Sequence, residues 1–127
     1  MAGEGRIDVV LVEDNDVFRE TLEILLDVTP DMNVVASVGD GRSAVEVCPT
    51  VEPDVVLLDY RLPGLDGVET TAGIRDACPG AAVVILTADV DPGEADALYE
   101  AGAGAVVTKD RPLDDIVTAI RDAARRE

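Results

Sequence analysis

The 127-residue sequence contains no histidine. This absence excludes the Ser-His-Asp and Cys-His arrangements of nucleophilic catalysis, zinc sites built on imidazole, and a phosphohistidine carried by this chain. Cysteine is scarce as well, because Cys48 and Cys78 are the only two. Two cysteines are too few for a four-cysteine zinc site or a disulfide scaffold, so we expect two small buried thiols in a reducing compartment.

Basic residues are also few. Ten Lys and Arg stand against 27 Asp and Glu, which gives a formal net charge of −17. Such a chain repels the phosphates of nucleic acids and the headgroups of anionic membranes. We therefore expect no direct nucleic-acid contact and no membrane association. Most of the acids are interpreted as solubilising, and the charge is compatible with a divalent cation or with a basic patch on a partner.

Long apolar runs are absent. No stretch approaches the roughly 18 residues of a membrane span, and residues 1–7 lack the hydrophobic region of a signal peptide. We therefore expect one cytoplasmic domain over residues 1–127. Hydrophobic residues make up 47% of the chain, which is a globular composition. Only Phe18, Tyr60 and Tyr99 are aromatic, so the core is expected to be aliphatic.

What is present is an alternation of short apolar runs and helical patterns. The three strongest runs are rich in β-branched residues, a composition typical of strands buried on both faces of a parallel sheet. Two weaker runs, the second and the fifth, are of the same kind. The five expected strands are Val9–Val12, Val34–Val38, Val55–Leu58, Ala82–Leu86 and Ala105–Val107.

Apolar residues at helical spacing fill the intervals. The first helix is expected to begin at an Asp16 N-cap and to end before Pro30. Its buried stripe is predicted to contain Phe18, Leu22, Leu25 and Val28, widened by Val17, Thr21 and Ile24. The second helix is expected to be short, because Pro49 follows Ser43–Cys48. The other three are predicted from Val68, Thr71, Ile74 and Cys78; from Ala95, Leu98, Tyr99 and Gly102; and from Leu113, Ile116, Val117, Ile120 and Ala124.

This fivefold alternation of strand and helix indicates an α/β fold with a parallel sheet and helices on both faces. A common order of such doubly wound sheets is 2-1-3-4-5, in which strands 1 and 3 are neighbours at the switch point. Ligands bind there, beyond the carboxyl ends of the strands. Glu13 and Asp14 follow the first strand and Asp59 follows the third, so they converge. Thr87 and Lys109 follow the fourth and fifth strands at the same edge.

Each of these residues alone has an ordinary explanation as a turn, a cap or a solvated side chain, but the combination is more specific. Three carboxylates at close range repel one another, by about 4 kcal/mol per pair at roughly 4 Å and an effective dielectric near 20. Mg²⁺ offsets such repulsion, and Lys109, the only lysine, adds a second positive charge. Asp59 can then act as a nucleophile toward a phosphoryl group. Mg²⁺, Lys109 and the Thr87 hydroxyl would each take one phosphoryl oxygen.

The chain resembles the receiver domain of two-component response regulators, over about Arg6 to Arg125. The matching pieces, in chain order, are Val12-Glu13-Asp14-Asn15, Pro53–Asp59, Leu62–Gly67, Leu86-Thr87-Ala88, Ala101-Gly102-Ala103 and Lys109. The six pieces have the order and the spacing of that family.

The resemblance implies a flavodoxin-like, doubly wound sheet of order 2-1-3-4-5 with five helices. It implies that Asp59 is the phosphoacceptor and that a sensor histidine kinase is the donor. Mg²⁺ would be bound directly by Asp14, Asp59 and the Arg61 backbone carbonyl, and by Glu13 through water. Thr87 and Lys109 would be the switch and phosphate-binding residues of the family. The domain would promote its own phosphorylation and dephosphorylation without being an enzyme for a separate substrate.

Two features point to a subtype. Lys109 is followed by Asp110 instead of the proline common in the family, and the end of the chain resembles receivers with a helix-turn-helix DNA-binding output. That output would lie beyond Glu127 and act on transcription, so the chain is either an isolated receiver from a longer regulator or a stand-alone one. The family often forms a homodimer on phosphorylation, which a charge of −17 per protomer opposes at low salt.

One position departs from the family pattern. Val106 stands where an aromatic residue usually precedes the lysine by three positions. A β-branched side chain has few rotamers, so we predict that the signal passes by movement of residues 88–102, with Asp91-Pro92-Gly93 as a flexible turn.

Three rival functions make different demands on the sequence. A degenerate receiver lacks one of the acids, the threonine or the lysine, and none is lacking here. A flavodoxin-type cofactor binder needs a phosphate loop after the first strand, where Glu13-Asp14-Asn15-Asp16 would repel phosphate. An aspartyl-phosphate hydrolase needs a second acid two residues beyond its nucleophile, and Arg61 stands there.

Overall fold

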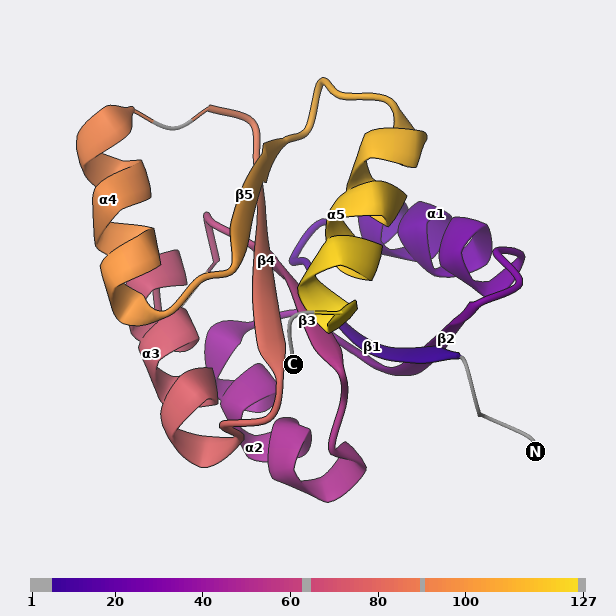
Figure 1. Cartoon of the computed structure of the whole chain (residues 1–127), viewed down its shortest axis with the longest axis horizontal. Coiled ribbons are helices and arrows are strands. Elements are labelled where there is room, and N and C mark those ends of the chain that lie inside the picture. Colours follow the sequence, from indigo (N-terminus) through magenta and orange to yellow (C-terminus); the bar gives the residue numbers. More distant parts are fainter. Residues whose placement is uncertain (1–5, 63–64, 90, 126–127) are drawn as a thin grey trace.

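The computed structural model describes residues 6–62, 65–89 and 91–125, so Pro63 and Gly64 of the family-like Leu62–Gly67 piece lie outside the described residues. Strands and helices alternate along the chain (Figure 1). The elements are β1 (Ile7–Val12), α1 (Asp16–Asp27), β2 (Met32–Val38), α2 (Gly41–Val51), β3 (Val55–Asp59), α3 (Gly67–Ala77), β4 (Ala82–Thr87), α4 (Pro92–Ala101), β5 (Ala105–Thr108) and α5 (Leu113–Arg125). The strands form one parallel sheet in the order β2-β1-β3-β4-β5. The predicted fold and strand order are confirmed.

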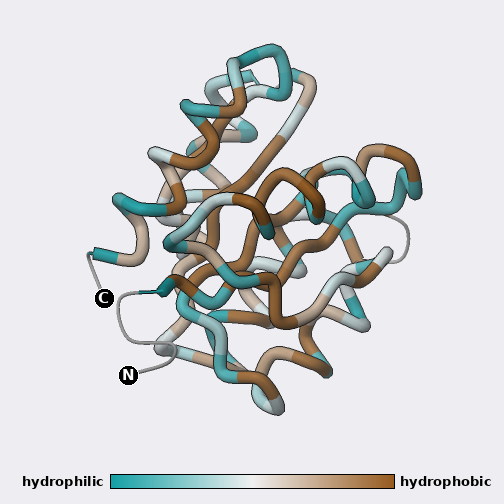
Figure 2. Tube along the Cα trace, turned by 90° about the vertical axis from the view of Figure 1, so that its right-hand side faces the viewer, coloured by the Kyte–Doolittle hydropathy of each residue, from teal (hydrophilic) through white to brown (hydrophobic). Residues whose placement is uncertain are grey.

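The central strands β1, β3 and β4 are buried on both faces. Side chains alternate across a strand, so Val9 and Leu11 pack in the core cluster with α1 and α5, whereas Val10 and Val12 pack with α2, α3 and α4. Figure 1 shows these two sets of helices on opposite sides of the sheet. In Figure 2 the apolar stretches run through the interior of the molecule. This double burial explains why the strand sequences are continuous apolar runs.

The strand register brings the polar strand ends together. Val12 of β1 pairs with Leu58 of β3, so Glu13 and Asp59, the next residues, leave neighbouring strands side by side. Asp59 in turn pairs with Leu86 of β4, and Thr87 pairs with Thr108 of β5. One edge of the sheet therefore collects the residues that the sequence pattern singled out.

Helix α1 buries a narrower face than the predicted one. Its buried residues are Leu22 and Leu26, whereas Val17, Ile24 and Val28 are 74%, 64% and 71% exposed. Residues spaced by four share one side of a helix, so the predicted Phe18 and Leu22 lie in the row that packs against the core. The predicted widening of the buried stripe by Val17 and Ile24, and its extension to Val28, were wrong, and these side chains form an exposed apolar stripe along α1 and its C-cap.

The N-cap of α1 is Asn15 and not Asp16. The Asn15 side chain accepts a hydrogen bond of 2.9 Å from the Phe18 backbone N–H, and Asp16 is the first helical residue. An aspartate in the first turn still suits the positive end of the helix dipole.

The proline and glycine signals act differently from the predictions in two helices. Pro49 lies inside α2, which continues to Val51. A proline in the final turn removes one hydrogen bond and does not stop the last residues from completing that turn. In α4, Asp91 is the N-cap, Pro92 occupies the first turn and Gly93 is helical, so this segment starts a helix and is not a flexible turn.

Two further side chains are more exposed than predicted. Tyr99 of α4 is 50% exposed, and Leu98 is the buried residue of that helix. Cys48 is buried as expected, and burial raises the pKa of its thiol to about 11. Cys78 is only partly buried.

Among the described residues, no helix combines the length and the apolar character needed to span a bilayer.

Candidate functional site

Three acidic side chains converge at the carboxyl ends of β1 and β3. Carboxylate oxygens of Glu13, Asp14 and Asp59 all lie within 4.8 Å of one another. Glu13 and Asp59 are 1% and 5% exposed, whereas Asp14 is open to solvent. The convergence predicted from the strand ends is confirmed. The cluster offers only oxygen ligands, which are the donors that Mg²⁺ prefers.

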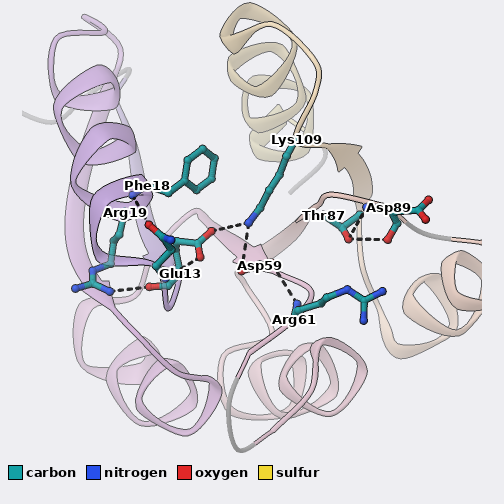
Figure 3. A network of polar contacts seen from close by, with 9 residues as sticks. Glu13, Phe18, Arg19, Asp59, Arg61, Thr87, Asp89 and Lys109 are labelled. Atoms are coloured by element: carbon teal, nitrogen blue, oxygen red, sulfur yellow. Dashed lines mark hydrogen bonds and ion pairs between the residues drawn. The ribbon is translucent and has the colours of Figure 1, made fainter.

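Lys109 places its ammonium group against two of these acids (Figure 3). Its Nζ lies 2.9 Å from Glu13 Oε1 and 3.4 Å from Asp59 Oδ2. Burial alone would lower the pKa of Lys109, but the hydrogen bond to Glu13 and the charges of Asp59 and Glu13 outweigh it and raise the pKa above the ordinary value. The lysine therefore stays charged at neutral pH, with two nearly buried carboxylates as its counter-ions.

Glu13 is held on both sides of its carboxylate. Oε1 accepts the hydrogen bond from Lys109, and Oε2 accepts one of 3.0 Å from the Asn15 backbone N–H. Its backbone carbonyl accepts a hydrogen bond of 2.7 Å from Arg19, which also pairs with Asp16 at 2.8 Å. Arg19 thus fixes the loop that presents the acids. Sequence analysis missed this residue, because nothing in the sequence pairs an arginine in α1 with a carbonyl six residues earlier.

Asp59 is oriented by its own loop. Its Oδ1 accepts a hydrogen bond of 3.2 Å from the Arg61 backbone N–H, while Oδ2 faces Lys109. Asp14 and Arg61 line one open depression of about 500 Å³, together with Tyr60, Leu62 and Asp66. Of the predicted metal ligands, the side chains of Glu13, Asp14 and Asp59 therefore meet, and Arg61 borders the space next to Asp14.

The Thr87 hydroxyl does not join this cluster. Thr87 is fully buried, and its Oγ1 donates a hydrogen bond of 2.9 Å to the Asp89 carbonyl in the same loop. Figure 3 shows Thr87 and Asp89 bonded to each other, apart from the acids. The predicted contact of Thr87 with a phosphoryl oxygen would require the bond to Asp89 to break.

Two of the three aromatic residues lie at the site, in places that the sequence did not indicate. The centroid of the Phe18 ring is 4.8 Å from Lys109 Nζ. The Tyr60 hydroxyl donates a hydrogen bond of 2.9 Å to Glu94 in the first turn of α4. Burial and this hydrogen bond raise the pKa of Tyr60. The only sequence signal for either contact is the scarcity of aromatic residues.

Comparison with known proteins identifies relatives of the whole domain. The NarL transcriptional regulatory protein of Mycobacterium tuberculosis H37Rv is 33% identical over 120 residues, which are 94% of this chain and 56% of that protein. LnrK, a transcriptional regulatory protein of Bacillus subtilis, is 35% identical over 114 residues, which are 90% of this chain and 52% of that protein. The chain spans about half the length of these relatives.

Solved structures of receiver domains share the fold. The signal receiver domain of NarL from Mycobacterium tuberculosis superposes with a TM-score of 0.90 at 33% identity, over 96% of this chain and 98% of that one. The response regulator domain of Thermotoga maritima CheB gives a TM-score of 0.86 at 27% identity, over 94% and 97% of the two chains. The response regulator receiver domain family matches residues 9–121. With sequence and fold in agreement over nearly the whole length, the chain belongs to the response regulator receiver domain family of two-component systems.

Proposed function

We propose that this domain accepts a phosphoryl group on Asp59 from a sensor histidine kinase and changes conformation to control an output. One observation carries the proposal. The Asp59 carboxylate is nearly buried, is oriented by the Arg61 N–H, and lies beside a charged lysine and two further acids. A structural salt bridge needs one acid per base, so the additional acids point to a cation-dependent reaction.

A divalent cation fits the charges at the site. Glu13, Asp14 and Asp59 contribute three negative charges and Lys109 one positive charge, which leaves −2. Mg²⁺ neutralises that remainder and matches the oxygen-only donor set. Asp14, Asp59 and the Arg61 carbonyl would hold it directly, and Glu13 through water. When bound, it would supply positive charge to the phosphoryl oxygens.

The chain's own residues then have distinct parts in the transfer. A carboxylate oxygen of Asp59 attacks phosphorus, and the donor leaves with the electrons of the broken bond. Lys109, 3.4 Å from Asp59 Oδ2, stabilises charge that develops on the phosphoryl group. Thr87 would contact a phosphoryl oxygen after leaving Asp89. The domain thus acts on itself and not on a separate substrate.

The exposed stripe on α1 supports a protein donor. Of the four large apolar side chains exposed in the described part of the chain, Val17 and Ile24 lie on this helix and Val28 is its C-cap. The helix begins directly after the acidic loop, at the Asn15 cap. A kinase surface that covers this stripe would bring its phosphohistidine to the edge of the site. This chain contains no histidine, so the phosphohistidine has to come from another protein.

The relatives support a wider role. NarL and LnrK are transcriptional regulatory proteins of which this chain covers 56% and 52%, which supports transcription as the controlled output, through a helix-turn-helix domain outside residues 1–127. Phosphorylation would favour a homodimer, and the protein would act in the cytoplasm without touching membranes or nucleic acid through this domain.

Intact-mass measurement tests the proposal. With a small phosphodonor and Mg²⁺, the domain should gain the mass of one phosphoryl group, and chelation of Mg²⁺ should prevent the gain. Asp59→Asn should abolish labelling, whereas Asp76→Asn, a change at an exposed aspartate of α3, should not. Labelling of Asp59→Asn at the wild-type level would reject the assignment, and an unlabelled wild type would reject the proposed function.

A further inference from the structure

Lys109 has a third neighbour besides its two carboxylates. The Phe18 ring centroid lies 4.8 Å from Nζ, within the distance at which an ammonium group is attracted to an aromatic face. Phe18 comes from α1 and Lys109 from the segment that follows β5, so the contact joins parts of the chain that are far apart in sequence (Figure 3). It also places the chain's only phenylalanine beside its only lysine.

The position of the ring is fixed by the surrounding structure. The Phe18 backbone N–H is bound by the Asn15 cap, and the side chain packs at the border of the core cluster formed with α5. Phe18 is therefore anchored by its backbone and by its packing, while one face of the ring is left toward Lys109. Its neighbour Val17, by contrast, is 74% exposed and points to solvent.

The Lys109 ammonium group needs a further contact to keep its position. Its ammonium group ends a flexible four-carbon chain with three N–H donors, and the Lys109 side chain is 26% exposed. Glu13 and Asp59 are its two carboxylate partners. Without a third contact, the ammonium could swing toward water while keeping only one acid. The ring supplies the third contact and fills space that water would otherwise take.

We propose that Phe18 is a positioning residue whose ring holds the Lys109 ammonium between Glu13 and Asp59. The inference rests on the proposed function, because it assigns a residue that supports the lysine used in phosphoryl transfer. Phe18 contacts Lys109, and the proposal gives it no contact with the phosphoryl group or the metal ion. It acts through Lys109, so its effect should disappear when Lys109 is absent.

The contact can be tested without any phosphorylation. Because the chain has one lysine, labelling with ¹³C-lysine gives a single set of side-chain signals in the NMR spectrum. Protons above a ring face are shifted upfield, so the Lys109 ε-CH₂ signal should move downfield in Phe18→Leu. Phe18→Tyr should keep the upfield position. Tyr99→Leu removes an exposed ring from α4, on the other side of the sheet, and should leave the signal unchanged. A Phe18→Leu signal at the wild-type position would overturn the proposal.

The effect of the Phe18–Lys109 contact on phosphoryl transfer is tested by the rate of labelling with a small phosphodonor. Phe18→Leu should slow labelling by about two- to fivefold, the size expected for a partly exposed cation–π contact, and Phe18→Tyr should restore most of the rate. In a Lys109→Met background, Phe18→Leu should produce no further slowing. An equal slowing in that background would show a general packing effect and overturn the positioning role, as would a wild-type rate in Phe18→Leu.

The two measurements separate the inference from the function on which it rests. A wild-type domain that takes no label would reject the proposed function, while the NMR comparison still decides whether Phe18 holds Lys109. A labelled wild type with an unchanged NMR signal in Phe18→Leu would reject the inference alone. Thermal melting of each variant confirms that it is folded.

Discussion

Replacing Lys109 with methionine should destabilise the metal-free domain strongly. The lysine is the counter-ion of Glu13 and Asp59, whose side chains are only 2% and 6% exposed. Lys109→Met keeps most of the apolar length of the side chain and removes its charge. Two neighbouring carboxylates would then lie nearly buried without a fixed cation, and each would repel the other.

The size of the expected loss of stability follows from the burial of the ion pair. Removing one partner of a buried ion pair costs about 3–5 kcal/mol. The Lys109 side chain is 26% exposed, so water can replace part of its charge, and we expect a loss of about 2–3 kcal/mol. A domain of this size loses about 4 °C of melting temperature per kcal/mol, so the expected decrease is about 8–12 °C.

Thermal unfolding followed by circular dichroism, in buffer with a chelator, measures this change. Arg42→Met is the matched control, because Arg42 is an exposed basic residue of α2, and it should change stability by less than about 0.5 kcal/mol. Adding Glu13→Gln to Lys109→Met should recover part of the loss, since one unpaired charge is removed. Excess Mg²⁺ should also narrow the gap to the wild type. If Lys109→Met melts like Arg42→Met, the two acids do not depend on the lysine.

Three further changes test other parts of the structure. Asp14→Asn should raise the metal-free melting temperature slightly, because it relieves repulsion at an exposed position, and should reduce the further rise caused by Mg²⁺; an undiminished Mg²⁺ effect would contradict a role in metal binding. Tyr60→Phe removes the 2.9 Å hydrogen bond to Glu94, so it should cost about 1 kcal/mol and speed amide exchange at the start of α4, and unchanged exchange there would show that Tyr60 does not hold this helix. Asp31 forms two hydrogen bonds of 2.7 and 2.8 Å with Arg121, which lower its pKa. The contribution of this ion pair to stability is present above the ordinary pKa of an aspartate and is lost as the pH falls through the lowered value. The melting temperature of Asp31→Asn should therefore lie below that of the wild type at pH 7 and approach it in strongly acidic buffer. An equal difference in melting temperature at both pH values would contradict the ion pair.

Strand positions and the acidic cluster could be predicted because they depend on patterns that the sequence carries directly. The runs Val9–Val12 and Val55–Leu58 are apolar on both faces, and double burial leaves few alternatives to a central parallel strand. Once the strand order is assumed, the residues after these runs must meet at one edge. Glu13, Asp14 and Asp59 therefore converge in the structure as predicted.

The hydrogen-bond partners of side chains at the site, and the buried face of α1, could not be predicted in the same way. The Thr87 hydroxyl can bond to any acceptor within reach, and only the conformation of the β4–α4 loop selects Asp89. The buried face of α1 depends on how the helix is rotated against the sheet, which decides that Leu22 is covered and Ile24 is not. Both choices are made by tertiary contacts, and local sequence spacing does not contain them.

The route by which phosphorylation would reach the rest of the domain remains a prediction. Val106 lies in β5 opposite Ile85, and Tyr60 links the residue after Asp59 to α4. The hydrogen bond between Tyr60 and Glu94 supports a route through α4. Amide exchange with and without a phosphoryl mimic should change in residues 88–102, of which residue 90 lies outside the described part of the chain. Changes confined to the loop after Asp59 would indicate a different route.

Locating the phosphoryl group on the chain tests the proposed function most directly. Borohydride reduces an aspartyl phosphate to homoserine, and mass spectrometry of the peptides then identifies the residue that carried it. After treatment with a phosphodonor and Mg²⁺, homoserine should occur at position 59 and be missing from samples treated with a chelator. Homoserine at any other aspartate, with position 59 unmodified, would contradict the assignment of Asp59 as the phosphoacceptor.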